Sequence, residues 1–515
     1  MSRAASMTQG THDVLHEHLA RADGQEDICF ALWRPSRGAG RTTALIGEPI
    51  LSEDGDRNVH GNASFNGRYL ARAAAIAADA GAGLALLHSH PGGAGWQGMS
   101  ADDISAESGS AARVKTMTAM PLIGLTLATR DGGWSARFWE KAGPREWERH
   151  DCEVVKVVGP RLRATFHPQL RPAPAFREEL ARTVSAWGEE TQATLARLRI
   201  GVIGLGSVGS IVAEALARMG IQHIRLMDFD AIERLNLDRV LHARGADVLE
   251  GLAKVELARR ALVESATAAD PQVDALEWSV VEEKGFRAAL DCDMLFSCVD
   301  RPWPRAALNL IAYAHLIPVV DGGIVVSRTR RGRMRGADWR AHIAAPGRAC
   351  LECIGQYNPG LVQMEREGRL DDPSYIERLA DDDPLRRNEN VFAFSLGCAS
   401  LEIAQFISMV VVPAGIASYG AQMYHLATGT LAHDHAVCGD RCLYAGPWQG
   451  RGDTTGIVVT GSHGAAAAAR EQRRRVRMKA ANSASRSERS RRRLHRRLVR
   501  AMRRMASALR SRRLQ

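Results

Sequence analysis

The chain has 515 residues, 45% of them hydrophobic and 24% charged, with a formal net charge of +10. A single hydrophobic core usually stops growing near about 250 to 300 residues, so this length predicts at least two domains of ordinary globular composition. The most apolar run, residues 403–412, is much shorter than the roughly 20 residues that cross a bilayer, and no charged-then-apolar leader begins the chain. We therefore expect a cytoplasmic protein without membrane contact.

The positive charge belongs to the last part of the chain. Residues 470–515 contain 19 Arg or Lys and only two acids, so the preceding residues are mildly acidic. Such a composition buries too little apolar surface to fold alone, and no aromatic residue lies between the arginines to stack on bases. We expect residues 448–515 to be a disordered basic tail, either solvated or bound through phosphates to nucleic acid or another anionic surface.

A proline-dense stretch divides the rest of the chain. Its prolines are Pro160, Pro168, Pro172 and Pro174. Prolines at this density break helices, so residues 151–176 are predicted to be a linker. We expect one domain over residues 1–150 and a second over residues 177–447.

Both domains show the patterns of α/β folds. In the first, strands are predicted at residues 28–33 and 84–87 and an alanine-rich helix at 69–80. The second opens with a strand at 199–203, a glycine turn, a helix at 208–219 and a strand at 224–227. That order predicts a βαβ unit with parallel strands.

Two histidines and a nearby acid in the first domain are spaced as metal ligands. His88 and His90 are two residues apart on a predicted strand, so both imidazoles point to the same side and can share one ion. Asp103, from the following helix, adds a carboxylate and leaves a fourth zinc position open for water, with Asp102 as the alternative ligand. Ordinary surface histidines near a glycine-rich loop are the alternative to a metal site.

The His-x-His-Pro run at residues 88–91, followed by Ser-x-x-Asp at residues 100–103, resembles the signature of JAMM/MPN zinc metalloproteases. The resemblance implies hydrolysis of a peptide or isopeptide bond by a zinc-bound water whose pKa falls to roughly 7. It implies a glutamate before the first core strand as the base, which is Glu26 here, with Asp27 as the alternative. It also implies that Ser100 helps to hold the oxyanion or the water.

The second domain begins with a glycine-rich turn between a strand and a helix. Gly204, Gly206 and Gly209 form a G-x-G-x-x-G pattern, and Asp228 ends the next strand. Glycines let the backbone approach phosphates at a helix N-terminus, and an acid at that strand end can bind a ribose hydroxyl. These residues alone fit a dinucleotide enzyme as well as an ATP enzyme.

The residues that follow distinguish the two. Asp228-Phe229-Asp230, Asn236, Arg239, Lys254 and Asp300 resemble the adenylyltransferase family that includes ThiF, MoeB and the ubiquitin-activating enzymes. The resemblance covers about residues 180–445 and implies a Rossmann-like fold that binds ATP and Mg²⁺. By position it implies that Asp228 binds the ribose, that Asn236, Arg239 and Lys254 contact phosphates, and that Asp300 holds magnesium. An adenylating enzyme needs such cations, because the attacking carboxylate and the polyphosphate repel each other.

Four of the nine cysteines form two close pairs, Cys350/Cys353 and Cys438/Cys442. Four thiolates without an open position make a structural zinc site, and relatives in the adenylyltransferase family carry two such pairs; isolated buried cysteines are the alternative. The resemblance also implies a thioester-forming cysteine after the first pair, but residues 356–390 contain none. Cys398 lies just beyond, where we expect it to be buried in a core helix.

These features predict a bifunctional α/β enzyme, a zinc (iso)peptidase joined to an ATP-dependent adenylyltransferase, that acts on a ubiquitin-like protein with a C-terminal glycine. The resemblances imply a bacterial ubiquitin-like conjugation or antiphage setting, a homodimer and a conjugating enzyme as a partner. Two other functions stay open. One is adenylation of a sulfur carrier for thiamine, molybdopterin or cysteine metabolism. The other is a binding protein with inactive heads that the basic tail recruits to nucleic acid.

Overall fold

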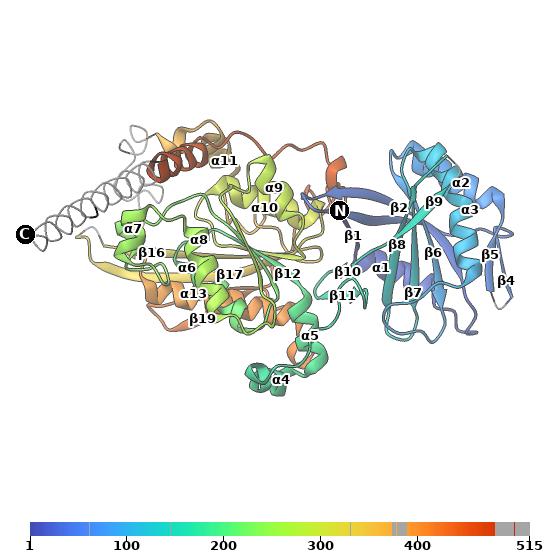
Figure 1. Cartoon of the computed structure of the whole chain (residues 1–515), viewed down its shortest axis with the longest axis horizontal. Helices are drawn as coiled ribbons and strands as arrows, with labels where there is room; N and C mark the ends of the chain where they lie inside the picture. Colours follow the sequence, from blue (N-terminus) through green and yellow to red (C-terminus); the bar gives the residue numbers. More distant parts are fainter. Residues whose placement is uncertain are drawn as a thin grey trace, which may run out of the picture.

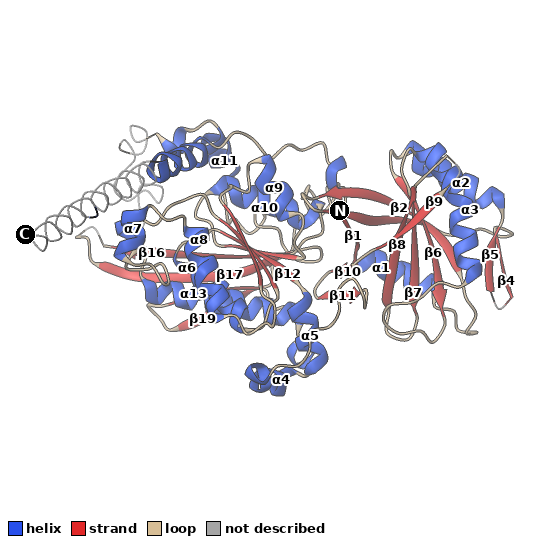
Figure 2. Cartoon of the chain, in the orientation of Figure 1, coloured by secondary structure: helices blue, strands red, loops and turns tan. Residues whose placement is uncertain are grey.

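The structure, a computed structural model, contains two α/β domains side by side along the long axis of the molecule (Figure 1). It describes residues 1–60, 62–144, 146–329, 331–372, 377, 389–478 and 499. Each domain is a β-sheet with helices on both faces (Figure 2). Both predicted α/β classes agree with this architecture.

Among the described residues, the N-terminal domain is built on a nine-stranded mixed sheet in the order β11-β10-β1-β3-β2-β6-β7-β8-β9. The strands are β1 (Ser2–Thr8), β2 (Ile28–Arg37), β3 (Arg41–Ile50), β6 (Gly83–His90), β7 (Leu122–Ala128), β8 (Gly133–Lys141), β9 (Trp147–Asp151), β10 (Val154–Val158) and β11 (Leu162–Phe166). Helix α1 (Gln9–Leu19) packs on one face, and α2 (Gly67–Asp79) and α3 (Ala101–Thr118) pack on the other. A separate hairpin consists of β4 (Arg57–His60) and β5 (Asn62–Phe65).

The predicted linker at residues 151–176 is wrong over most of its length. Strand β10 pairs in parallel with β1, and β11 pairs with β10 as an edge hairpin, so residues 154–166 complete the N-terminal sheet. Pro160 lies in the turn of that hairpin, where a missing N–H costs no ladder hydrogen bond. Only the residues after Phe166 connect the two domains, and Arg171 among them is buried.

The C-terminal domain contains an eight-stranded sheet, counted over the described residues, in the order β14-β13-β12-β15-β16-β17-β18-β19. Its first five strands are parallel: β14 (Gln272–Leu276), β13 (His223–Met227), β12 (Arg199–Ile203), β15 (Met294–Ser297) and β16 (Val319–Arg328). Three antiparallel strands extend it: β17 (Met334–Ala344), β18 (Ala421–His425) and β19 (Thr430–Asp434). The predicted βαβ unit is present as β12, α6 (Ser207–Arg218) and β13.

Helices cover both faces of this second sheet. Helices α6, α8 (Lys254–Ser265) and α13 (Phe392–Val410) pack on one face, and α9 (Glu283–Ala289) and α10 (Pro302–Ala314) pack on the other. Of the helices in the described ranges, α13 is the one long and apolar enough to span a bilayer by length and composition, with a mean hydropathy of 1.5. Its buried Phe406 and Met409 pack in the core of the domain.

The remaining described helices are short and lie outside these layers. They are α4 (Ala181–Trp187), α5 (Glu189–Arg197), α7 (Gly245–Glu250) and α11 (Pro359–Arg366). The start of the predicted disordered tail is also folded, because residues 464–478 form a helix that packs on the second domain. The basic segment from residue 479 onward lies outside the described residues, except for Val499. The expected contact with nucleic acid falls on that segment.

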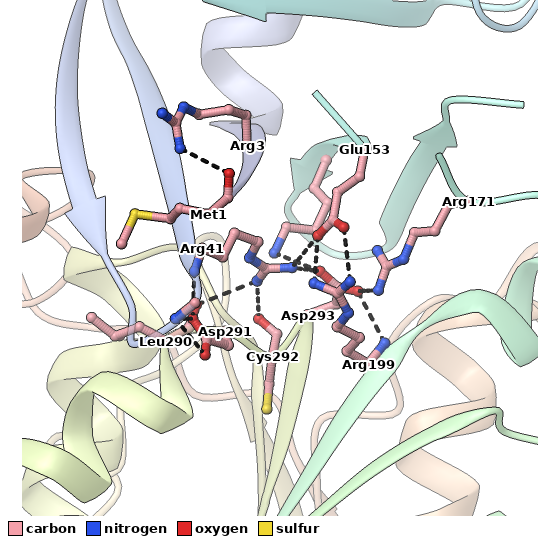
Figure 3. A network of polar contacts seen from close by, with 12 residues as sticks. Met1, Arg3, Arg41, Glu153, Arg171, Arg199, Leu290, Asp291, Cys292 and Asp293 are labelled. Atoms are coloured by element: carbon pink, nitrogen blue, oxygen red, sulfur yellow. Dashed lines mark hydrogen bonds and ion pairs between the residues drawn. The ribbon is translucent and has the colours of Figure 1, made fainter. Parts of the chain in front are cut away.

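A buried ionic network joins the two domains (Figure 3). Asp293, the residue before β15, is fully buried. Three cations of the N-terminal domain and its connection surround its carboxylate: Arg41 at 2.7 Å, Arg171 at 2.9 Å and Lys156 at 3.3 Å. Burial alone would raise the pKa of Asp293, but these cations hold it well below its usual range.

Neighbouring groups extend the same junction (Figure 3). Glu153 pairs with Arg199 of β12 at 2.6 Å, and Asp291 accepts the backbone N–H groups of Gly40 and Arg41 at 3.0 and 2.9 Å. Apolar residues of both domains also belong to one continuous core. The junction therefore joins the turn between β2 and β3 to the N-terminal ends of β12 and β15.

We expect Asp293→Asn to destabilise the whole chain, because it leaves three buried cations facing a neutral amide. Removing one partner of a buried ionic group costs about 3 to 5 kcal/mol in the free energy of unfolding. The matched control is Asp274→Asn on β14, whose partially exposed pair with Arg225 should contribute less than about 1 kcal/mol. Chemical denaturation of both variants measures the difference, and equal losses would contradict the role of the junction.

Candidate functional sites

The glycine turn between β12 and α6 has the shape of a phosphate cradle. Gly204 has a φ of +92°, and a Cβ there would lie 2.6 Å from the carbonyl oxygen of Cys298. A Cβ on Gly209 would lie 1.8 Å from the carbonyl oxygen of Gly204. A Cβ on Gly206 would meet no atom within 4 Å, and no side chain caps the helix that follows it. Two glycines thus close-pack the turn, while the third leaves open space at the start of α6.

Carboxylates from neighbouring strand ends surround one lysine beside this turn. Lys254 Nζ lies 2.8 Å from Asp230 Oδ2. Burial alone would lower the pKa of Lys254, but the charges of Asp228, Asp230 and Asp300 raise it, so the ammonium stays protonated. The structure therefore brings together three acids and one cation that come from separate stretches of the sequence.

Asp228 is fixed where β13 ends. Its two carboxylate oxygens accept the backbone N–H groups of Leu205 at 2.7 Å and Asp230 at 2.8 Å. Burial raises the pKa of Asp228, and the charge of Lys254 opposes that shift. Because Leu205 belongs to the glycine turn, this carboxylate ties the turn to the next strand.

Asn236 and Arg239 lie on the segment after Asp230, and their printed contacts are local. The Asn236 side chain accepts the backbone N–H of Glu233 at 2.9 Å. Arg239 donates to the carbonyl of Leu235 and, at 2.9 Å, to the carboxylate of Asp238. Their predicted phosphate contacts therefore stay predictions.

Asp300 is exposed at the C-terminal end of β15, as a residue that binds a metal ion from solvent requires. The following residue, Arg301, pairs with Asp371 at 3.1 Å. This pairing turns the Arg301 side chain toward the segment after α11.

Sequence reasoning missed two residues at this site. Glu365 of α11 accepts the backbone N–H of Trp303 at 2.8 Å, and burial raises its pKa to about 7. Asn390 donates to the hydroxyl of Ser207 at 2.6 Å, at the first residue of α6. Both come from chain segments far from the glycine turn, and no spacing in the sequence indicates the contacts.

The three predicted zinc ligands of the N-terminal domain lie together. The Nε2 atoms of His88 and His90 are 3.3 Å apart, and the Asp103 carboxylate lies 3.4 Å from His88 and 3.7 Å from His90. One ligand atom from each residue lies within 4.8 Å of the others. Burial would raise the pKa of Asp103, but the two imidazoles lower it below its usual range. Two nitrogens and one carboxylate oxygen fit a zinc ion with an open position.

The structure separates the two candidates for the base. Asp27 is buried and ion-paired to Arg57 at 2.7 Å and Arg21 at 3.4 Å. Glu26 is partly exposed, and its charge contributes to the raised pKa of His90. Two arginines therefore hold Asp27, and the assignment of Glu26 as the base stays a prediction.

Ser100 has a structural contact that the motif alone does not reveal. Its hydroxyl oxygen accepts the backbone N–H of Asp103 at 3.1 Å, and the Asp103 side chain accepts the backbone N–H of Ser100 at 2.7 Å. This reciprocal capping box fixes the start of α3 and points Asp103 toward the histidines. The proposed contact of Ser100 with an oxyanion stays a prediction.

The four paired cysteines also form a cluster. The sulfur atoms of Cys350, Cys353, Cys438 and Cys442 all lie within 4.8 Å of one another. Backbone N–H groups of Cys350, Cys353 and Ala445 point at the sulfurs, which is the hydrogen bonding that stabilises thiolates. This donor set fits a structural zinc site. Cys398 lies instead in α13, fully buried, and burial raises the pKa of its thiol.

Comparisons with known proteins find matches to the second domain. Residues 179–430 match the model of the ThiF family. Molybdopterin-synthase adenylyltransferase of Escherichia coli K12 is 29% identical over 168 residues, 32% of this chain and 61% of that protein. Ubiquitin-like modifier-activating enzyme 5 of Caenorhabditis elegans is 31% identical over 122 residues, 22% of this chain and 28% of that protein.

Two further matches include the same domain. tRNA threonylcarbamoyladenosine dehydratase of Escherichia coli K12 is 32% identical over 154 residues, 29% of this chain and 54% of that protein. The crystal structure of E. coli MccB with ATP is 17% identical, with a TM-score of 0.41, and the match covers 53% of this chain and 75% of that chain. The chain spans less than two thirds of each of the three curated relatives.

We expect the purified protein to carry one zinc ion in each of the two clusters found among the described residues. Replacing both His88 and His90 with Ala should remove one ion. Replacing both Cys350 and Cys438 with Ser should remove the other and also lower the unfolding temperature, because structural zinc contributes to folding. Elemental analysis measures the content, and unchanged zinc in either variant would contradict that assignment.

Proposed function

Because residues 179–430 form a ThiF-family domain, we propose that this chain uses ATP to adenylate the C-terminal carboxylate of a small ubiquitin-like or sulfur-carrier protein. The observation that carries the proposal is the position of Lys254 among Asp228, Asp230 and Asp300, next to an open glycine turn. A cation at this place can attract polyphosphate, and the flanking acids can hold a ribose hydroxyl and magnesium.

The open space at Gly206 supports the fit of a nucleotide. A phosphate there would meet the uncapped N–H groups at the start of α6, which is twelve residues long. Asp228 keeps this turn beside the end of β13, where a ribose would lie in a parallel α/β sheet. Bound ATP would supply the adenylyl group and pyrophosphate as the leaving group.

The reaction would transfer the adenylyl group of ATP to the carrier and release pyrophosphate. A carrier carboxylate oxygen forms a bond to the α-phosphorus while the bond from that phosphorus to pyrophosphate breaks. No net proton is needed, so the work of the site is to hold two anions together. Lys254 offsets their charge, and Asp300 is placed to hold the metal that offsets the rest.

The sulfur-carrier alternative has one specific observation in its favour. A ubiquitin-activating reaction that continues to a thioester needs an accessible thiol, whereas Cys398 is fully buried and its thiol pKa is raised. Residues 356–390 contain no cysteine. Formation of a thiocarboxylate that depends on an added sulfur donor would support a sulfur carrier, and a conjugate without that donor would support a ubiquitin-like modifier.

We expect ATP/pyrophosphate exchange that depends on one particular glycine-ended carrier. Lys254→Ala and Asp300→Ala should each lower the exchange rate by about 100-fold or more, since each removes charge stabilisation of the transferring phosphoryl group. The matched control is Arg260→Ala on the same helix α8, which breaks only an exposed pair with Glu256. Exchange that survives in Asp300→Ala would contradict its role.

We also propose a second activity in the N-terminal domain, zinc-dependent cleavage of a peptide or isopeptide bond next to the carrier's C-terminus. This proposal is supported by the cluster of His88, His90 and Asp103 and by the nearby charge of Glu26. The cluster lies outside the ThiF match, which begins at residue 179, so the adenylation proposal does not explain it. A zinc-bound water would attack the carbonyl carbon, and Glu26 would move its proton to the leaving amine. The product would be the free carboxylate that the other domain uses.

We expect Glu26→Ala to abolish cleavage of a carrier precursor or conjugate while zinc stays bound, because the ligands are untouched. Carrier-dependent ATP/pyrophosphate exchange should be unchanged in that variant. Asp300→Ala supplies the reciprocal control, with cleavage kept and exchange lost. Mass spectrometry of the carrier measures both products, and cleavage that persists without Glu26 would refute its assignment as base.

A further inference from the structure

A segment beyond the second domain contacts all the turns that carry the nucleotide-site charges. We call residues 457–478 the clasp; its helix, residues 464–478, is the red helix of Figure 1. The sequence predicted disorder here, and neither the ThiF match nor the proposed reaction assigns it a role. Its contacts lie on three turns that are separate in sequence.

The first turn follows Asp228. Arg473 donates a hydrogen bond to the carbonyl oxygen of Phe229, the residue directly after that aspartate. The ring of His463 also lies edge-on to the ring of Phe229, with centroids 5.0 Å apart. Both contacts restrain the backbone from which the Asp228 carboxylate binds the glycine turn.

The second turn follows Asp300. Trp303, the second residue of α10, lies three residues later, and its indole N–H donates to the carbonyl oxygen of Val459 at 2.7 Å. His463 packs against the same indole, with ring centroids 5.6 Å apart. One buried histidine of the clasp thus lies between Phe229 and Trp303, which flank the two acids.

The third turn precedes Lys254. Val476 lies beside Gly251, where a Cβ would be 3.4 Å from the valine side chain, an ordinary van der Waals distance. Gly251 has a φ of +59° and ends α7, three residues before the lysine. The clasp helix therefore also limits the position of the first turn of α8.

Ion pairs hold the clasp helix in this place. Arg473, only 3% exposed, pairs with Glu277 at 2.8 Å, and Arg470 pairs with Glu282 at 2.5 Å. Arg470 also lies over the ring of Trp278 at 4.3 Å, a cation–π contact. Buried, bidentate and stacked arginines hold a helix more firmly than exposed pairs do.

We propose that the clasp contains positioning residues of the nucleotide site, with Arg473 and His463 as the principal ones. Arg473 and His463 hold the turns of Asp228 and Asp300, and Val476 lies against the turn before Lys254, so that the three turns can bind the ribose, phosphates and metal together. This inference rests on the proposed ATP-dependent function and adds to it a contribution from outside the matched family region. No clasp residue belongs to the charged cluster itself. We therefore expect the loss of a clasp contact to weaken nucleotide binding rather than to slow the chemical step.

The test compares Arg473→Ala with Arg474→Ala in the full-length protein. Arg474 is exposed and, among the described residues, pairs with Glu471 of the same helix at 2.9 Å, so its variant controls for lost charge. For Arg473→Ala we expect the KM for ATP to rise by about tenfold with little change in kcat, since a misplaced turn weakens binding first. Glu277→Ala should reproduce the effect, and the double variant should add little to it.

Hydrogen exchange of the protein without ATP gives an independent readout. The N–H groups of Leu205 and Asp230, which bind the Asp228 carboxylate, should exchange faster in Arg473→Ala than in Arg474→Ala. Equal hydrogen-exchange rates in the two variants, or equal KM values for ATP, would overturn the positioning role of the clasp. A wild-type chain that binds no ATP would instead overturn the proposed function, and the exchange rates would still decide whether the clasp positions these turns.

Discussion

The structure depends on one buried carboxylate, Asp293, which the second domain inserts among cations of the first. A charge with no exposed surface is costly unless its partners are close and fixed, so Arg41, Arg171 and Lys156 must keep their positions. Those positions in turn fix the turn between β2 and β3 and the residues after β11. The two sheets therefore behave as one folded unit rather than as two domains on a flexible linker, and each site inherits a fixed orientation.

The same physics recurs at the nucleotide site with the balance reversed. At the junction three cations enclose one acid, whereas at the glycine turn three acids lie near one lysine. The first arrangement is fully buried and closed to solvent, which suits a structural role. The second lies beside a glycine turn with open space at Gly206 and includes the exposed Asp300, an arrangement that magnesium and a ribose would complete under the proposed function.

Local patterns predicted much of this architecture. The βαβ unit and the cluster of His88, His90 and Asp103 depend on neighbours within a strand, a turn and a helix, so spacing alone places them together. The edge hairpin of residues 154–166 was missed because Pro160 and the prolines that follow the hairpin indicate a linker, and because Lys156 interrupts an otherwise apolar strand. Its partner, Asp293, lies far along the chain, and no local pattern shows that the lysine is buried. The clasp was missed for a similar reason. In the sequence Arg473 belongs to a run of arginines that predicts a solvated segment, and only the fold shows its contacts with Glu277 and Phe229.

The junction also determines the distance between the two candidate sites, the histidine cluster of the N-terminal domain and the glycine turn of the C-terminal domain. His88 pairs with Ile28 at the start of β2, and the junction lies at the other end of that strand, about 30 Å away. The glycine turn lies a further five-residue strand, about 16 Å, beyond the junction on the opposite side. If the proposed cleavage and adenylation both occur, a carrier tail released at one end would have to cross this distance to reach the other. A shared chain would then favour transfer only for a carrier that stays bound, because a free carrier diffuses to any neighbouring molecule.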